Sequence, residues 1–146
     1  MITILIEGGG CFISMVVEGY EREFAEDFSD ANWLKCRIKV SVGAFSAEID
    51  ATITTHDFVE FQNELSKAMK SLSGAATFRT DEEWLSIDIE FNARGSAHVR
   101  GATQVHGFPK ANLAFEFETD QSYLSQTCVQ LEKVVENFPV RVQSDA

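Results

Sequence analysis

Alternation of apolar and polar residues predicts a series of strands along the chain. The stretch "WLKCRIKVSV" over residues 33–42 places its apolar side chains on one face and Lys35, Arg37 and Lys39 on the other. The earlier stretch "CFISMVVEGY" over residues 11–20 is apolar on both faces, as in a central strand. Three stretches in the second half alternate in the same way and predict three more strands: "WLSIDIEF", "SAHVRGATQVH" and "ANLAFEFET".

A hairpin is predicted at Gly43-Ala44, because a two-residue turn with glycine first suits type II′. Such a turn fixes which residues lie opposite each other, and opposite charges across a ladder contribute roughly 0.2–1 kcal/mol each. The basic stripe at residues 35–39 therefore has a structural explanation that needs no ligand. The predicted pairs, the first of them on the core face, are Val42 with Phe45, Lys39 with Glu48 and Arg37 with Asp50.

Two segments have apolar residues at helical spacing. The first covers residues 55–72, where Asp57 followed by Glu60 predicts a capping box with Asp in the cap position. The second covers residues 120–138 and stops just before Pro139. The predicted buried stripes are Phe58, Phe61, Leu65, Ala68, Met69 and Leu72 in the first helix, and Leu124, Cys128, Leu131, Val134, Val135 and Phe138 in the second.

The predicted order of elements is four strands, a helix, four strands and a helix. Strands that follow one another through short turns pair antiparallel, and the helices must then cover a sheet. We therefore expect an α+β fold of ββββα-ββββα order, with a largely antiparallel, curved sheet of seven to eight strands and two helices on one face. The length of 146 residues fits a single domain over residues 1–146.

Charge narrows the classes of partner. Acidic residues outnumber basic ones by 23 to 12, so the formal net charge is −11, and the pI is about 4.6. Such a negative field repels phosphate backbones and anionic lipid surfaces, so we expect neither a nucleic-acid partner nor a membrane partner. A protein with a basic surface fits this charge better, and homo-oligomerisation stays open.

The cysteines and the N-terminus indicate a cytoplasmic protein. Cys11, Cys36 and Cys128 are far apart and odd in number, which argues against a complete disulfide framework and favours reduced thiols. The apolar run in "MITILIEGGG" is too short for a membrane span and lacks the basic region of a signal peptide.

Motifs for catalysis or cofactor binding are weak. His98 and His106 share strand parity, but eight residues of extended chain separate them by ~26 Å. The glycines at 8–10 precede a strand, whereas a phosphate loop needs a helix and a lysine there. The acidic triplet at 81–83 lacks a glycine at the spacing of a cation loop. We therefore expect no catalytic residue, no metal site, no cofactor and no enzymatic activity.

The stretch from residue 18 to residue 30 carries six acids and one base. Carboxylates on such a loop can steer association with a basic protein surface. Two phenylalanines among the acids supply apolar anchors of the kind enriched at interface hot spots. The candidate partner-binding residues are Glu18, Glu21, Glu23, Phe24, Glu26, Asp27, Phe28 and Asp30, with Glu82 and Glu83 as a second patch.

Three stretches carry a family resemblance. They are "SDANWLKCRIKV" after the acidic loop, a "T-x-x-D-F-x-x-F…L" helix and a late "L…VVENFPVR" helix, and the sharpest part is "DANWL" at residues 30–34. Together they resemble the WapI-like immunity proteins, which are encoded beside polymorphic toxins of contact-dependent or wall-associated systems. The resemblance spans most of the chain. It implies a cytoplasmic protein that binds and blocks a cognate toxin, and such toxins include RNA-cleaving domains.

Other functions stay open at this point. A scaffold domain that homodimerises through its sheet requires a large apolar contact between copies and has no need of the acidic loop. A small-ligand binder requires a preformed cavity, for instance between sheet and helices, with a few convergent polar groups. An enzyme is the remaining alternative.

Overall fold

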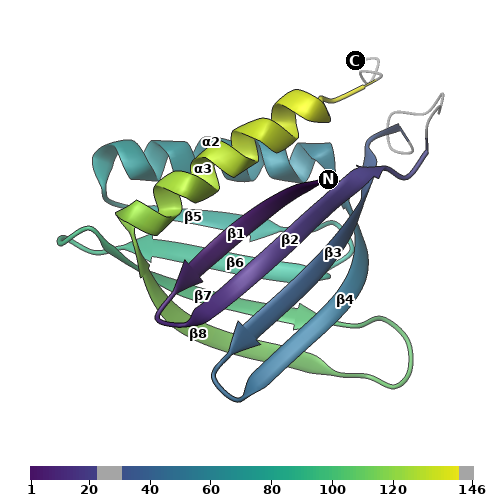
Figure 1. The fold of residues 1–146 in the computed structure, drawn as a ribbon, viewed down its shortest axis with the longest axis horizontal. Coiled ribbons are helices and arrows are strands. Elements are labelled where there is room, and N and C mark those ends of the chain that lie inside the picture. The colour runs from purple at the N-terminus through teal and green to yellow at the C-terminus, as the bar shows by residue number, and fades with distance from the viewer. Residues whose placement is uncertain (23–30, 142–146) are drawn as a thin grey trace.

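The computed structural model of the protein describes residues 1–22 and 31–141. Within them, eight strands form two antiparallel four-stranded sheets, each with its strands in chain order (Figure 1). The first sheet contains β1 (Ile2–Gly8), β2 (Cys11–Tyr20), β3 (Trp33–Val42) and β4 (Phe45–Thr54). The second sheet contains β5 (Ala75–Arg79), β6 (Leu85–Phe91), β7 (Ser96–Gln104) and β8 (Asn112–Asp120).

Within the same described residues, two helices of 17 residues each complete the ββββα-ββββα order. Helix α2 (Thr55–Ser71) follows β4 and helix α3 (Gln121–Asn137) follows β8, and both lie on the same side of the sheets (Figure 1). The predicted α+β class, antiparallel pairing and element order are confirmed. The strands form two sheets rather than one curved sheet, because β4 and β5, which α2 connects, do not pair with each other.

Each helix packs against the sheet of the other half of the chain: α2 contacts β5, and α3 contacts β1. Side chains from the second half also bond the outer edge of β1. The Leu5 amide donates to Gln130 Oε1 (2.8 Å), and the Thr127 hydroxyl donates to the Leu5 carbonyl (2.7 Å). Nearby, the Thr119 hydroxyl donates to the Glu7 carbonyl (2.6 Å). The edge of β1 is therefore covered.

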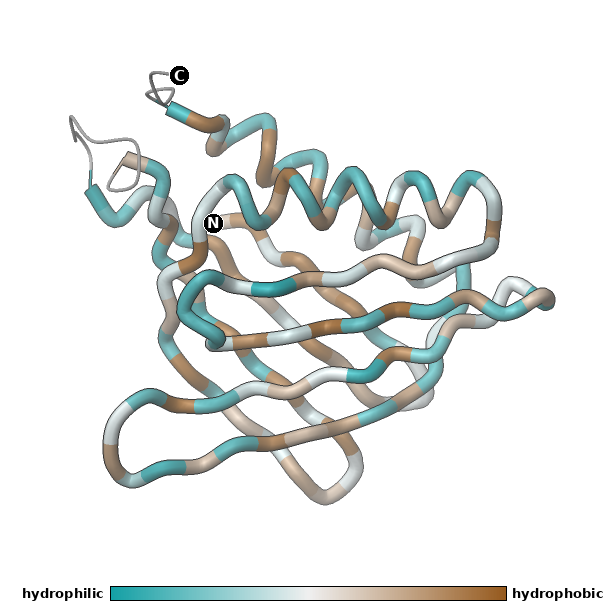
Figure 2. The backbone as a smooth tube through the Cα atoms, turned by 180° about the vertical axis from the view of Figure 1, so that it is seen from behind, coloured by the Kyte–Doolittle hydropathy of each residue, from teal (hydrophilic) through white to brown (hydrophobic). Residues whose placement is uncertain are grey.

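One cluster of buried side chains fills the space between the sheets and the helices. Figure 2 shows the alternation of hydrophilic and hydrophobic residues along the strands that produces it. Phe58 and Phe61 of α2 pack on Phe78 of β5, with ring centroids 5.6 and 5.1 Å apart. Gly8 lies so close to the backbone of β8 that an added Cβ would clash with the Glu118 carbonyl. The two halves therefore meet through backbone as well as side chains.

The hairpin of β3 and β4 has the predicted register. Gly43 takes the positive φ of +59° that its turn requires. Phe45 pairs with Val42 on the predicted face, but it is 68% exposed because it lies at the tip of the hairpin. The three predicted pairs are present: Val42 with Phe45, Lys39 with Glu48, and Arg37 with Asp50.

The ends of α2 differ from the prediction. Its N-cap is Thr54, not Asp57, because Thr54 ends β4 in an extended conformation and its hydroxyl accepts the Asp57 amide (3.1 Å). Leu72 is the C-cap with a left-handed φ of 49°, which turns its side chain out of the predicted stripe. The rest of both stripes is buried or packs against the core: Phe58, Phe61, Leu65, Ala68, Met69, Leu124, Cys128, Leu131, Val134, Val135 and Phe138.

Candidate functional site

The described candidate residues lie at one end of the molecule, where β2 ends and where β5 turns into β6. Glu18 and Glu21 are exposed at the end of β2, and Glu82 and Glu83 are exposed in the turn at residues 80–84. We call this region the acidic end and define it by Glu18, Glu21, Asp57, Asp81, Glu82 and Glu83. Six other predicted partner-binding residues lie outside the described residues: Glu23, Phe24, Glu26, Asp27, Phe28 and Asp30.

A chain of contacts joins the two acidic patches. The Glu21 amide donates to the Trp33 carbonyl (2.8 Å), and Trp33 pairs with Thr54 across β3 and β4. Thr54 caps α2, so Asp57 follows in the first turn of the helix. Asp57 in turn lies close enough to Asp81 for that charge to raise its pKa. Segments far apart in the sequence thus meet at one end of the fold (Figure 1).

Asp57 is the buried carboxylate of the acidic end. The residue is 6% exposed, and its Oδ2 atom is buried with no hydrogen-bond partner among the described residues. Burial, together with the negative charge of Asp81, raises the pKa of Asp57 to about 6, although hydrogen bonds from Thr54 and from the Asp81 backbone oppose the shift. The acidic end therefore contains a carboxyl group that takes up a proton just below neutral pH.

The turn that carries Glu82 and Glu83 is held at both of its ends. The Thr80 hydroxyl accepts the Trp84 amide (2.8 Å), and the Thr80 carbonyl accepts the Glu83 amide (3.1 Å). Glu83 itself has a φ of +58°, a left-handed conformation that is uncommon for a residue with a Cβ. The Trp84 ring meets His106 edge-on, with centroids 4.2 Å apart, and His106 also bonds the Glu82 carbonyl. These contacts fix the backbone from which the two exposed Glu side chains extend.

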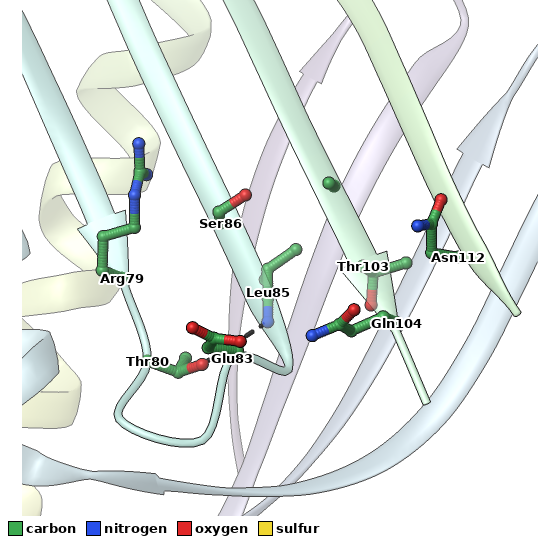
Figure 3. Close-up of a pocket in the computed structure, with 9 residues that line it drawn as sticks. Arg79, Thr80, Glu83, Leu85, Ser86, Thr103, Gln104 and Asn112 are labelled. Atoms are coloured by element: carbon green, nitrogen blue, oxygen red, sulfur yellow. Dashed lines mark hydrogen bonds between the residues drawn. The ribbon is translucent and has the colours of Figure 1, made fainter. Parts of the chain in front are cut away.

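A hollow of about 290 Å³ opens beside this turn (Figure 3). Arg79, Ser86 and Ala102 are consecutive partners across β5, β6 and β7, and the small side chains of Ser86 and Ala102 leave the space empty. Glu83 and Gln104 lie on the side nearest the turn (Figure 3). The hollow runs across the strands of the second sheet, and does not lie between sheet and helices, the example given for the small-ligand alternative.

The positively charged guanidinium of Arg79, which lines this hollow, already has several hydrogen-bond acceptors. Arg79 Nη2 lies 2.8 and 3.0 Å from the two carboxylate oxygens of Asp88. Arg79 Nη1 donates to the carbonyls of Phe78 (2.9 Å) and Ile87 (3.1 Å). A guanidinium with these partners has little capacity left for an anion. The hollow is therefore poorly suited to a phosphate or carboxylate ligand.

Residues of the "DANWL" stretch fasten the chain that follows α3. Asn32 is buried, donates to the Arg141 carbonyl (3.0 Å) and accepts the Arg141 amide (2.7 Å). The Arg141 guanidinium donates to the carbonyls of Ala31 (2.6 Å) and Arg22 (2.7 Å). It also lies 3.5 Å from the centre of the Tyr20 ring, a cation–π contact. Arg141 thus ties the chain before residue 23 to the chain after residue 30.

The chain matches the model of the WapI-like immunity protein family over residues 3–139. The protein belongs to this family. The match includes both sheets, both helices and the described part of the acidic end, so the resemblance inferred from the three stretches is confirmed. A comparison with the curated proteins finds no match to the chain.

Other candidate chemistry in this family member is weak. Burial raises the pKa of the Cys36 thiol to about 12 and also raises that of Cys128, so neither thiol is activated. Within residues 1–22 and 31–141, no three His, Cys, Asp or Glu side chains come together to hold a metal ion. Neither of the two described helices combines the length and the hydrophobicity that a membrane span requires.

Sequence reasoning missed the roles of Asp57 and Arg141. For Asp57, a local signal was present: Thr54 lies three residues earlier and is a better cap. For Arg141, no local signal exists, because its partners Arg22, Ala31 and Asn32 lie 109 to 119 residues away in the chain.

Proposed function

We propose that this protein binds a cognate toxin in the cytoplasm and blocks it through its acidic end, and that the toxin is a nuclease with a basic surface. The observation that carries the proposal is the match to an immunity protein family over residues 3–139. The net charge of −11 supports a basic partner. A nuclease needs a basic surface to hold phosphates, so an acidic protein can occupy that same surface.

The acidic end suits this role because the turn that carries two of its acids has a fixed backbone before binding. Glu82 and Glu83 stand on a turn fixed by Thr80, Trp84 and His106. Preorganised groups lose less conformational entropy when a complex forms. The proposal extends to the acids and phenylalanines of residues 23–30. Inhibition then follows from occupying the toxin surface, with no catalytic step.

Binding kinetics with the toxin domain encoded beside this gene test the proposal. The double variant Glu82→Gln/Glu83→Gln removes two charges from the acidic end. The control Glu90→Gln/Glu118→Gln removes two exposed charges that flank His98, at the far ends of β6 and β8. We expect the first pair to slow association about fivefold at low salt and to flatten its salt dependence, with a much smaller effect of the control.

Two outcomes would count against the proposal. If both pairs stay folded and slow association equally, recognition does not occur through the turn at residues 80–84. If the wild-type protein fails to bind the product of the neighbouring gene, the assignment of a cognate toxin is wrong.

A further inference from the structure

The outer edge of β4 is open. The two-residue turn makes Val42 and Phe45 a hydrogen-bonded pair, so alternate residues of β4 direct their backbone N–H and C=O groups away from β3. Within residues 1–22 and 31–141, no hydrogen bond reaches these outward backbone groups. The outward residues are Ser46, Glu48, Asp50 and Thr52.

The edge of β1, on the opposite side of the same sheet, differs because several of its outward backbone groups have hydrogen-bond partners. There, the outward groups of β1 include those of Leu5 and Glu7, and all of their described partners are side chains from the second half of the chain. Proteins commonly cover or block edge strands, because an unpaired edge is a template for another strand. The first sheet therefore has one covered edge and one edge that remains available.

A hollow of about 260 Å³ runs along the open edge. One wall is β4 and the other is formed by the end of β7 and the start of β8. A strand added to β4 would lie about 4.8 Å away, and every second side chain would point toward this hollow. Its apolar lining residues are Phe45, Ala47, Ile49, Val105, Ala111 and Leu113.

The acidic side chains along the edge of β4 favour a strand with basic side chains as the binding partner. Glu48 and Asp50 are exposed on β4, beside Lys39 and Arg37 on β3. A second copy of this chain that paired through its own β4 would bring acidic residues against acidic residues, which destabilises a ladder. A strand with basic side chains would instead continue the alternation of basic β3 and acidic β4.

We infer that the edge of β4 is a docking site for an extended strand of the basic toxin. The strand pairs with the outward backbone groups of β4, sets basic side chains against Glu48 and Asp50, and places apolar side chains in the hollow. The identity of the partner rests on the proposed function. The surface itself shares no residue with the acidic end, so the two contacts can be separated.

Affinity for the inactivated toxin domain encoded beside this gene tests the docking site. Glu48→Pro removes an outward amide without touching the bonds to β3. Glu48→Gln removes the charge but keeps the amide. Thr3→Pro is the matched control, since Thr3 is exposed and outward-facing on β1. We expect Glu48→Pro to weaken binding about tenfold, Glu48→Gln about twofold, and Thr3→Pro hardly at all.

Hydrogen exchange on the wild-type complex gives a readout that does not depend on a variant folding. The amides of Ser46, Glu48 and Asp50 should become protected on binding, while the amide of Thr3 should not. A tight complex without this protection overturns the docking site and leaves the toxin assignment intact. Failure of the wild type to bind overturns both. A dimer of the free protein that Glu48→Pro dissociates overturns the assignment to a toxin strand.

Discussion

The two halves of the chain share one order of elements but begin their helices differently. In the second half, Asp120 is the N-cap of α3, and its Oδ1 atom accepts the amides of Ser122 (2.9 Å) and Tyr123 (3.1 Å). In the first half, Thr54 is the cap, and the acidic residue Asp57 lies buried inside the first turn with one oxygen unpartnered among the described residues. One carboxylate thus caps its helix, whereas the other carries an electrostatic cost within the acidic end.

The capped helix is a feature that the fold requires, whereas the buried carboxylate belongs only to the acidic end. A ββββα unit needs a capped helix, and both halves provide one. It does not need a buried carboxylate with a pKa near 6 next to another carboxylate. Three substitutions test the comparison, and they are ordered by the size of the expected effect.

The largest effect is expected where the halves touch. Gly8→Ala would push a Cβ into the backbone of β8 at Glu118 and Thr119, which cannot move as a flexible side chain would. We expect the free energy of unfolding to fall by about 3 kcal/mol. Chemical denaturation measures this, with the exposed substitution Thr3→Ala on the same strand as control. A loss below ~1 kcal/mol would show that β1 and β8 can separate without cost to the fold.

A gain in stability is expected from Asp57→Asn. The pKa of Asp57 rises from 3.8 to about 6 on folding, so the folded state binds this proton more tightly than the unfolded state does. The unfolding free energy therefore decreases as the pH rises between these two values, and the full penalty applies at pH 7. Removing the charge should stabilise the protein at pH 7 by about 1–2 kcal/mol, less than the ~3 kcal/mol of the full shift, because Asn keeps a polar group at the same buried position and loses part of the hydrogen bonding that the carboxylate accepts.

Unfolding curves for wild type and Asp57→Asn between pH 4 and pH 7 check this expectation. The difference in stability should shrink as the pH falls through 6 toward 4. A variant that is less stable at pH 7, with the pH dependence of the wild type, would show that the carboxylate is well accommodated when charged.

The smallest effect is expected from the carboxylate that caps α3. Asp120→Ala removes the acceptor for the amides of Ser122 and Tyr123. We expect a loss of about 1 kcal/mol, as for other N-cap residues. Thermal unfolding at pH 7 measures it, and Asp120→Asn should restore most of the loss because its side-chain oxygen also accepts. Equal loss in both variants would indicate that the charge, not the acceptor, matters at this cap.

Much of the fold could be predicted because its signals are local. Gly43-Ala44 set the register of the hairpin, and the spacing of Phe58, Phe61 and Leu65 defined the buried face of α2. The division into two sheets could not be predicted, since alternation shows that a strand has a buried face but not which strand it faces. The exposure of Phe45 could not be predicted for the same reason: its register was right, but a hollow separates it from the end of β7 and the start of β8.

For the candidate site, the sequence predicted which stretches are acidic but not how they are arranged in space. The sequence shows acids at residues 18–30 and at 81–83, yet nothing in it indicates that Asp57 lies between them. Likewise, Glu48 was recognised as a cross-strand partner of Lys39, but its open edge depends on which elements fail to cover β4. Such properties arise from the packing of remote segments.

Covering β1 with the last helix has a consequence during synthesis. Leu5 receives its edge bonds from residues 122 and 125 positions later in the chain, so the hairpins of the first sheet can form before those partners leave the ribosome. A chain stopped before residue 121 would keep the Thr119 contact to Glu7 but would leave the outward groups of Leu5 open, in addition to the edge of β4, and would be prone to aggregate. Emergence of α3 is therefore the step that protects the first strand and leaves β4 as the open edge of that sheet.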